Sequence, residues 1–461
     1  MSGVRSITMK TTFAALAALT LLMLSARADA IEIKRMTLSN GAVLLVSESH
    51  QLPMVTISIA FDAGARRDPE GKAGLAALTA HSLSQGTKDL TVEQFDQKVD
   101  FMGSSIGISA DRDYAIAGMT TLKKYLDQTL ALLAGAIATP GLRETDIERR
   151  RGETVAQIRA AEEQPNYVAS VAFEKAVFGN TPYGHPINGT EESASKLTPD
   201  DVRSFYRDHY KLGSAVIAVT GDVTADDIKA MLEKDLTGPT GAVTPQPEPT
   251  VPPIAAGLHP SLIDRNVAQA TIILGFDGVA RSNPDYYKLK VMNYILGGGE
   301  FSSRLMKIVR SKNGLAYGID SDLDAGKFPG SYRISVQTKN KTATETISII
   351  LQQLREIQEK PVSDSELEDA KKFLIGSFPL SIDRQSEITG FMLGIELNGL
   401  GLDYADQYPK LIGGVTKEDV QNVARKYLHP DAADLIVVAN QSEADIKAAK
   451  LENVDAPATQ K

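Results

Sequence analysis

The 461-residue sequence contains no cysteine. It therefore has neither a disulfide framework nor the lipid-modified cysteine of a bacterial lipoprotein, and no thiol reports its redox compartment. It also lacks a long apolar run, because the most apolar segment, residues 13–24, is shorter than the about 20 residues that a membrane-spanning helix needs. These absences argue against a disulfide-stapled scaffold and against an integral membrane protein.

Residues 1–30 are predicted to be a signal peptide. Basic residues precede the apolar run, and Ala28-Asp29-Ala30 places small side chains where signal peptidase requires them. A cut after Ala26-Arg27-Ala28 and a start at Met9 fit the same pattern. We expect export across a bacterial inner membrane into the periplasm.

The mature chain is acidic. Without residues 1–30 it has 46 basic and 57 acidic residues, a net charge of −11. This surplus makes nucleic acids and other polyanions poor partners. The remaining length corresponds to two to four domains at about 100–200 residues each, and a hydrophobic content of 43% is enough for a large core.

A proline-rich segment divides the mature chain into halves of similar size. Seven of the 21 prolines fall within residues 236–260, and such a segment behaves as a semi-rigid extended spacer. We therefore predict an N-terminal domain at residues 31–235, a linker at 236–260 and a C-terminal domain at 261–461.

The two halves have the pattern of one duplicated α+β unit. A threonine-capped helix followed by a strand closes the first half at residues 198–219, and the same pattern closes the second at 416–438. Each half also opens with a buried strand, at Met54–Phe61 and Ala270–Phe276. Amphipathic stretches follow at residues 121–137 and 342–359. This order predicts two homologous halves, each an antiparallel sheet packed with helices.

Residues 74–87 have the frame of the inverted zinc-peptidase motif H-x-x-E-H but keep only its last histidine, His81. In a working site both histidines bind zinc, and the glutamate is the general base for the metal-bound water. Ala77 and Ala80 occupy the positions of the first histidine and the glutamate. A methyl group neither ligates a metal nor accepts a proton, so the chain is not predicted to cleave peptides alone.

The chain resembles the pitrilysin/insulinase metallopeptidases, and within them the two-subunit branch that includes bacterial and mitochondrial-processing-peptidase-like proteins. The likeness covers residues 35–445, and its motifs are Gly74–Thr87, Tyr183–Pro186 with Gly189 and Thr190, the closing segment 198–222, Leu296–Gly299 with Ser302–Leu305, and Arg310 with Gly314–Tyr317. The resemblance implies that each chain is half of a clamshell, and that two chains enclose a peptide chamber.

The same resemblance places the family's third zinc ligand, a glutamate, at Gln157. A neutral amide is a poor ligand where a carboxylate is required. Glu153, Glu162 and Glu163 lie nearby, and a shifted alignment would recruit one of them without restoring the missing histidine and base. We therefore expect no metal in this chain and zinc in a partner subunit, and we expect His81 to be a packed or locally hydrogen-bonded residue.

Arg310 and Tyr317 are the candidate functional residues. Gly314 between them should end a helix and let Tyr317 begin a strand, which brings the two side chains to one junction. The resemblance implies that this pair binds substrate backbone and stabilises the oxyanion in trans, with the guanidinium and the phenol as donors. The alternative for so short a pattern is a surface ion pair beside a half-buried aromatic ring.

Gly297-Gly298-Gly299 resembles a phosphate-binding turn, but no lysine followed by serine or threonine stands in the required frame. We expect instead a mobile loop that admits substrate, as in related processing peptidases.

Three functions are compatible with these patterns. The first is a non-catalytic, activity-completing subunit of a secreted heterodimeric zinc endopeptidase, paired with a homologous H-x-x-E-H subunit and acting on unfolded or short peptides. The second is a catalytically silent scaffold or peptide-binding protein of the same fold. The third is a self-sufficient peptidase with an unrecognised metal site. The retained Arg310 and Tyr317 favour the first.

Overall fold

The computed structural model describes residues 31–252, 256–444 and 446, so the predicted signal peptide lies outside the described residues. The first half is built on a six-stranded sheet with the order β1-β2-β6-β3-β5-β4. Its strands are β1 (Lys34–Thr37), β2 (Val43–Glu48), β3 (Met54–Phe61), β4 (Ser105–Ala110), β5 (Ala115–Leu122) and β6 (Val216–Gly221). Its helices are α2 (Leu75–Leu83), α3 (Val92–Phe101), α4 (Leu126–Ala138), α5 (Glu144–Glu162), α6 (Pro165–Phe178), α7 (Glu191–Lys196), α8 (Pro199–His209) and α9 (Ala225–Asp235), with short 3₁₀ turns η1 (Ala65–Arg67), η2 (Lys123–Tyr125) and η3 (Leu212–Ser214).

The second half is built on a five-stranded sheet with the order β7-β11-β8-β10-β9. Its strands are β7 (Gly257–Asp264), β8 (Gln269–Asp277), β9 (Ala316–Leu323), β10 (Ser331–Lys339) and β11 (Ala432–Ala439). Its α-helices are α10 (Tyr286–Asn293), α11 (Ala343–Glu359), α12 (Asp364–Ser377), α13 (Gln385–Leu397), α14 (Tyr404–Gly413), α15 (Lys417–Tyr427) and α16 (Gln441–Ala444). Two π-helical segments, η4 (Tyr294–Gly298) and η6 (Met306–Lys312), and three 3₁₀ turns, η5 (Glu300–Ser302), η7 (Asn340–Thr342) and η8 (Phe378–Ile382), complete it.

The two sheets share one strand order, because β2-β6-β3-β5-β4 corresponds to β7-β11-β8-β10-β9. Neighbouring strands are antiparallel except for β2 with β6 and β7 with β11. In each parallel pair one strand lies near the start of its half and the other near its end, and parallel pairing needs such a long crossover. The predicted α+β fold of two related halves is confirmed, with one parallel pair in each sheet that the sequence pattern did not reveal.

The closing helices begin where their threonines predict. The hydroxyls of Thr198 and Thr416 accept the backbone N–H groups of Asp201 and Asp419, and each aspartate completes a capping box. The predicted helix at 342–359 is α11. The stretch from residue 121 differs, because residues 121–125 finish β5 and form a turn before α4 begins.

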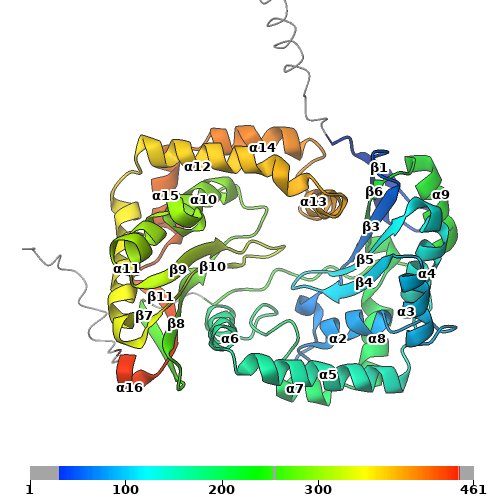
Figure 1. The fold of residues 1–461 in the computed structure, drawn as a ribbon, viewed down its shortest axis with the longest axis horizontal. Coiled ribbons are helices and arrows are strands. Elements are labelled where there is room, and N and C mark those ends of the chain that lie inside the picture. Colours follow the sequence, from blue (N-terminus) through cyan, green and yellow to red (C-terminus); the bar gives the residue numbers. More distant parts are fainter. Residues whose placement is uncertain (1–30, 253–255, 445, 447–461) are drawn as a thin grey trace, which may run out of the picture.

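The halves exchange helices. Helix α6 of the first half packs on β8 and β11 of the second sheet, and α13 of the second half packs on β3 and β6 of the first sheet (Figure 1). Phe173 of α6 is fully buried in a cluster with Ile273 and Ile436, and Met392 of α13 is buried against Ala218. Each sheet therefore has its own helices on one face and a helix from the other half on the other.

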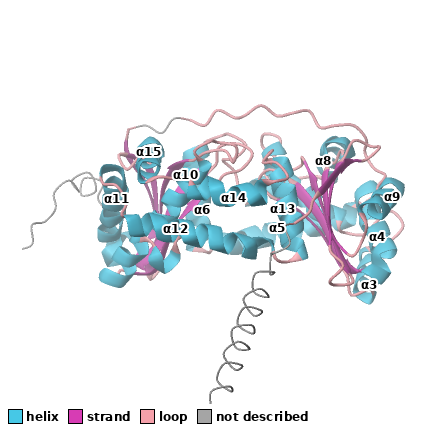
Figure 2. Ribbon diagram, turned by 90° about the horizontal axis from the view of Figure 1, so that it is seen from above, coloured by secondary structure: helices cyan, strands magenta, loops and turns pink. Residues whose placement is uncertain are grey.

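Polar contacts also join the halves. In the loop between β9 and β10, the N–H of Lys327 donates to Asp113 Oδ2 at 2.8 Å, and Asp113 also accepts the Tyr183 hydroxyl. The side chain of Gln246, in the segment joining the halves, bonds to the buried Arg66. Figure 2 shows this segment crossing between the two sheets along one side of the molecule. Gly257 already begins β7, and Pro260 is tolerated there because β7 is an edge strand.

Among the helices of the described ranges, none combines the length and the apolar character needed to cross a membrane.

Candidate functional site

Helix α2 carries the degenerate zinc motif, and the two alanines of this motif are buried. Ala77 is 2% exposed and Ala80 is fully buried. His81, one turn after Ala77, is half-buried. Burial lowers the pKa of His81, and the nearby Arg150 guanidinium lowers it further. The lowered pKa favours the neutral imidazole, and the positive charge of Arg150 beside it opposes the approach of a metal cation.

The neighbouring helix α5 supplies no replacement ligand. Arg149 and Arg150 both bind the carboxylate of Glu153, at 2.5 and 2.9 Å, so the charge of this acidic side chain is already neutralised. Gln157 lies on the exposed side of α5. No group of three or more histidine, aspartate or glutamate side chains able to hold a metal occurs in the described part of the chain. A zinc ion needs three protein ligands in a catalytic site, and these residues do not fit it.

The second half brings Arg310 and Tyr317 together. The guanidinium carbon of Arg310 lies 4.8 Å from the centroid of the Tyr317 ring and 4.6 Å from that of Phe301. As the sequence predicts, Gly314 ends the helical segment η6, with φ of +63°, and β9 begins two residues later. Within the described residues the Arg310 guanidinium has no hydrogen bond or ion pair, so its N–H groups remain available as donors.

A β-bulge decides which way Tyr317 faces. Ala316 pairs with Thr338 and Ile319 pairs with Val336, so two residues of β9, Tyr317 and Gly318, stand opposite one residue of β10. The extra residue shifts the in-out alternation, and Tyr317 is 87% exposed.

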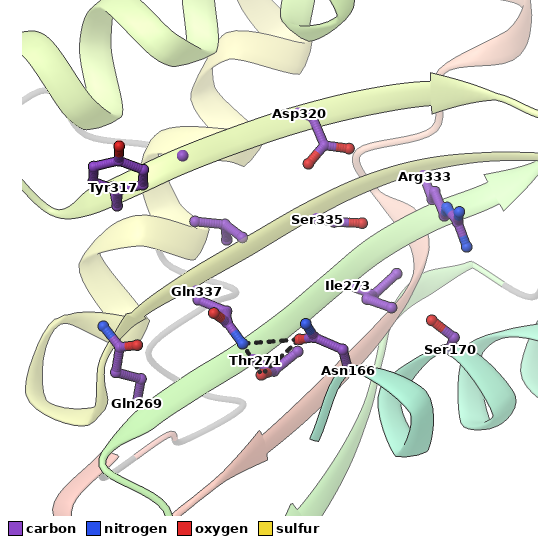
Figure 3. A pocket seen from close by; sticks show the side chains of 12 residues that line it. Asn166, Ser170, Gln269, Thr271, Ile273, Tyr317, Asp320, Arg333, Ser335 and Gln337 are labelled. Atoms are coloured by element: carbon purple, nitrogen blue, oxygen red, sulfur yellow. Dashed lines mark hydrogen bonds between the residues drawn. The ribbon is translucent and has the colours of Figure 1, made fainter. Parts of the chain in front are cut away.

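A groove of about 480 Å³ begins at Tyr317 and runs between the second sheet and helix α6 (Figure 3). Asn166 of α6 accepts hydrogen bonds from Thr271 at 3.3 Å and from Gln337 at 2.9 Å, so side chains from both halves form its wall. Asp320 and Arg333 bring opposite charges to its floor. Burial raises the pKa of the Asp320 carboxyl, and the nearby Arg333 opposes that shift.

The glycine-rich segment before Phe301 was expected to be a mobile loop, and in the structure it ends a closely packed π-helical turn. A Cβ at Gly297 would lie 2.4 Å from Ser321 Oγ in β9, and one at Gly299 would lie 2.5 Å from the carbonyl oxygen of Tyr294. Gly297 therefore allows the π-helical turn η4 to lie directly against the strand that carries Tyr317.

Comparison with known proteins identifies the family. A family model described as "Insulinase (Peptidase family M16)" matches residues 43–191, and one described as "Peptidase M16 inactive domain" matches residues 196–374. The chain belongs to the peptidase M16 family. A "non-peptidase homolog" of Helicobacter pylori is 26% identical over 402 residues, which are 87% of this chain and 92% of the relative.

Solved M16 structures have the same fold. The "peptidase M16 inactive domain" of Pseudomonas fluorescens superposes with a TM-score of 0.83 at 27% identity, covering 88% of this chain and 98% of the other. A chain of complex III from Candida albicans shares the fold, with a TM-score of 0.77 at 18% identity and coverage of 92% and 99%. With Ala77 and Ala80 in its zinc motif, this chain is an inactive member of the M16 family, as its resemblance to the family predicts.

Sequence reasoning missed two features of the site. No sequence pattern pointed to Phe301, because a single phenylalanine after a run of glycines is typical of a loop. The α6 wall of the groove, with Asn166, was also missed, since it depends on a helix from one half crossing to the sheet of the other.

Proposed function

We propose that this chain is the non-catalytic, activity-completing subunit of a heterodimeric zinc endopeptidase located in the bacterial periplasm. Its partner is a homologous subunit with an intact H-x-x-E-H motif, and the substrates are unfolded or short peptides that enter the space between the two chains. This chain supplies substrate binding and transition-state stabilisation.

The proposal rests on a difference between the two halves in the functional groups that each one contains. The first half has lost the groups that bind and use zinc, at Ala77, Ala80 and Gln157. The second half keeps Arg310 and Tyr317 side by side at the end of a groove, with the arginine donors unused by the described residues. An unpaired guanidinium beside an exposed phenol is suited to a peptide carbonyl and is of little use to folding.

The chemistry follows from these donors. Zinc held by the partner would supply the activated water. The planar guanidinium of Arg310 donates to a carbonyl oxygen of the bound peptide and fixes its position. The hydroxyl of Tyr317 donates to the oxyanion that develops on the scissile carbonyl, and such a donor acts mainly on the transition state. The catalytic site is complete only when both chains are present.

The direct test is peptidase activity on a long fluorogenic peptide, measured for this chain, for an H-x-x-E-H partner and for the mixture, with bound zinc counted in each. We expect turnover only in the mixture and zinc only in the partner. A partner that is fully active alone would refute the completing role, and zinc with activity in this chain alone would refute the assignment of its degenerate positions.

The second candidate is a scaffold or peptide-binding protein that takes no part in catalysis. The shared fold with a chain of complex III from Candida albicans, together with the loss of the zinc groups, favours it. It predicts that Arg310 and Tyr317 have no effect on turnover in the assembled complex.

A further inference from the structure

Among the residues that the structure describes, Arg310 contacts two aromatic rings and forms no ion pair with an acid. Phe301 is 63% exposed and Tyr317 is 87% exposed, so neither ring is fixed by burial in the core. Both lie within 5 Å of the Arg310 guanidinium carbon, measured to the ring centroid. A cation at this distance is attracted to the face of an aromatic ring. This contact restrains the guanidinium without using any of its N–H donors.

A nearby arginine shows the usual alternative. Arg304, in the same segment, donates from Nε and Nη2 to both oxygens of Glu366, at 2.6 and 3.0 Å. That arrangement fixes a side chain for structural purposes and consumes its donors. Arg310 is instead restrained through the faces of two rings. Its N–H groups therefore stay free to donate to a ligand.

The backbone of Glu300, the residue before Phe301, is strained. Glu300 has φ of +45°, a conformation uncommon for a residue other than glycine. The hydroxyl of Ser303, which is fully buried, donates to the Glu300 carbonyl at 2.9 Å and holds this turn. Strain of this kind persists only where the surroundings enforce it, and it gathers at functional sites.

The helix α10 and the π-helical turn η4, which precede Phe301, are tied to the strand that carries Tyr317. Asn293 Nδ2 donates to the Ser321 carbonyl at 3.1 Å, and Ser321 Oγ donates to Asn293 Oδ1 at 2.6 Å. Since Gly297 of η4 also lies directly against Ser321, the segment just before the Phe301 turn is held against β9. The turn η5, which carries Phe301, in turn contacts η6, which carries Arg310 and packs on β9.

We propose that Phe301 is a positioning residue for Arg310. With Tyr317, its ring holds the guanidinium at the end of the groove with the donors free for a peptide carbonyl. The inference rests on the proposed function, because the benefit appears only when a peptide is bound and cleaved. Phe301 acts through Arg310, so its removal should matter only while Arg310 is present.

The arrangement can be tested on the isolated chain, whose sequence contains no tryptophan. F301W places a single indole beside Arg310. We expect slower acrylamide quenching and higher anisotropy in F301W than in F301W/R310A. As a matched control, F373W places an indole at another exposed position, on α12 beside Tyr294, and should not respond to R310A. Equal quenching in F301W and F301W/R310A would overturn the proposed contact.

The functional part is tested by turnover in the mixture with an H-x-x-E-H partner. We expect F301A to lower kcat about 10-fold with a smaller change in KM, F301Y to restore most of it, and F301L to restore little because it lacks an aromatic face. F301A should cause no further loss in an R310A background. Additive losses, or full rescue by F301L, would show that Phe301 acts by packing or by direct contact.

The two proposals fail differently. If R310A leaves turnover unchanged, the completing role itself is refuted, and the positioning role with it. If R310A is impaired while F301A is not, only the role of Phe301 is refuted.

Discussion

Phe173 of helix α6 packs directly on Gly275 of strand β8, so closely that a Cβ at residue 275 would lie 2.7 Å from the phenyl Cζ. The ring belongs to the first half and the glycine to the second. The contact is part of the helix exchange, because Phe173 is fully buried among residues of the other sheet. It holds α6, which forms one wall of the groove, against the second sheet.

We therefore expect F173A to lower the free energy of unfolding by about 3–5 kcal/mol, the usual loss for deleting a buried phenyl ring. Urea denaturation measures it. A176S, at an exposed position on the same helix, should stay within about 0.5 kcal/mol of the parent chain. A loss below about 1 kcal/mol in F173A would mean that α6 does not form part of the core of the second half.

Tyr317 should matter for turnover and not for folding. Y317F removes one hydroxyl from an exposed side chain, so the unfolding midpoint should not move. In the mixture with an H-x-x-E-H partner, kcat should fall on the order of 100-fold, as for one oxyanion donor. A decrease of less than a few-fold would count against the assigned role.

Turnover should require the guanidinium group of Arg310 and not merely a positive charge at residue 310. Lysine keeps the charge but loses the planar set of donors, so R310K should resemble R310A in turnover. K307A provides the matched control, because Lys307 is an exposed cation on the same segment η6, and its loss should leave kcat unchanged. Full activity in R310K would indicate that only positive charge is required.

Restoring the missing zinc ligands should not be sufficient for tight zinc binding. A77H/Q157E supplies a second histidine and a carboxylate beside His81, but Arg150 remains close enough to lower the pKa of His81. The cation disfavours a metal at this position. We expect A77H/Q157E/R150A to bind zinc more tightly than A77H/Q157E in competition with a chromophoric chelator. Equal affinities would show that Arg150 is not the obstacle.

The sequence alone predicted those features of the fold that depend on a residue and its close neighbours in the chain. The caps at Thr198 and Thr416, the helix end at Gly314 and the strand start before Tyr317 each follow from one residue type and its neighbours. The presence of two related halves also followed from repeated patterns, although the order of strands in each sheet did not.

Features that depend on contacts between distant segments could not be predicted. The exchange of α6 and α13 pairs surfaces that each look like ordinary amphipathic faces in sequence. The bulge that turns Tyr317 outward is a property of the pairing between β9 and β10, and neither strand shows it alone. For the same reason Phe301, whose role depends on Arg310 nine residues later, gave no signal.

Asp68 gives the fold a pH dependence that can be measured. Its carboxyl is buried beneath the start of α2, where it accepts the N–H groups of Gly74 and Ala76, each at 2.7 Å. Burial raises its pKa to about 7, although the two amides oppose this shift. Between pH 4 and pH 7 the folded chain then keeps a proton that the unfolded chain has released.

Because the folded state binds the extra proton, Asp68 contributes less stability as the pH rises through this window, by up to about 1.4 kcal/mol per pH unit, and the trend levels off above pH 7. D68N removes the titration and keeps one side-chain oxygen as an acceptor. His185 has the opposite effect, since burial lowers its pKa and stability falls as it becomes protonated. The quantity to follow is therefore the unfolding free energy of the parent minus that of D68N, which should decrease from pH 4 to pH 7. A difference that rises with pH would mean that the amides of α2 hold Asp68 charged.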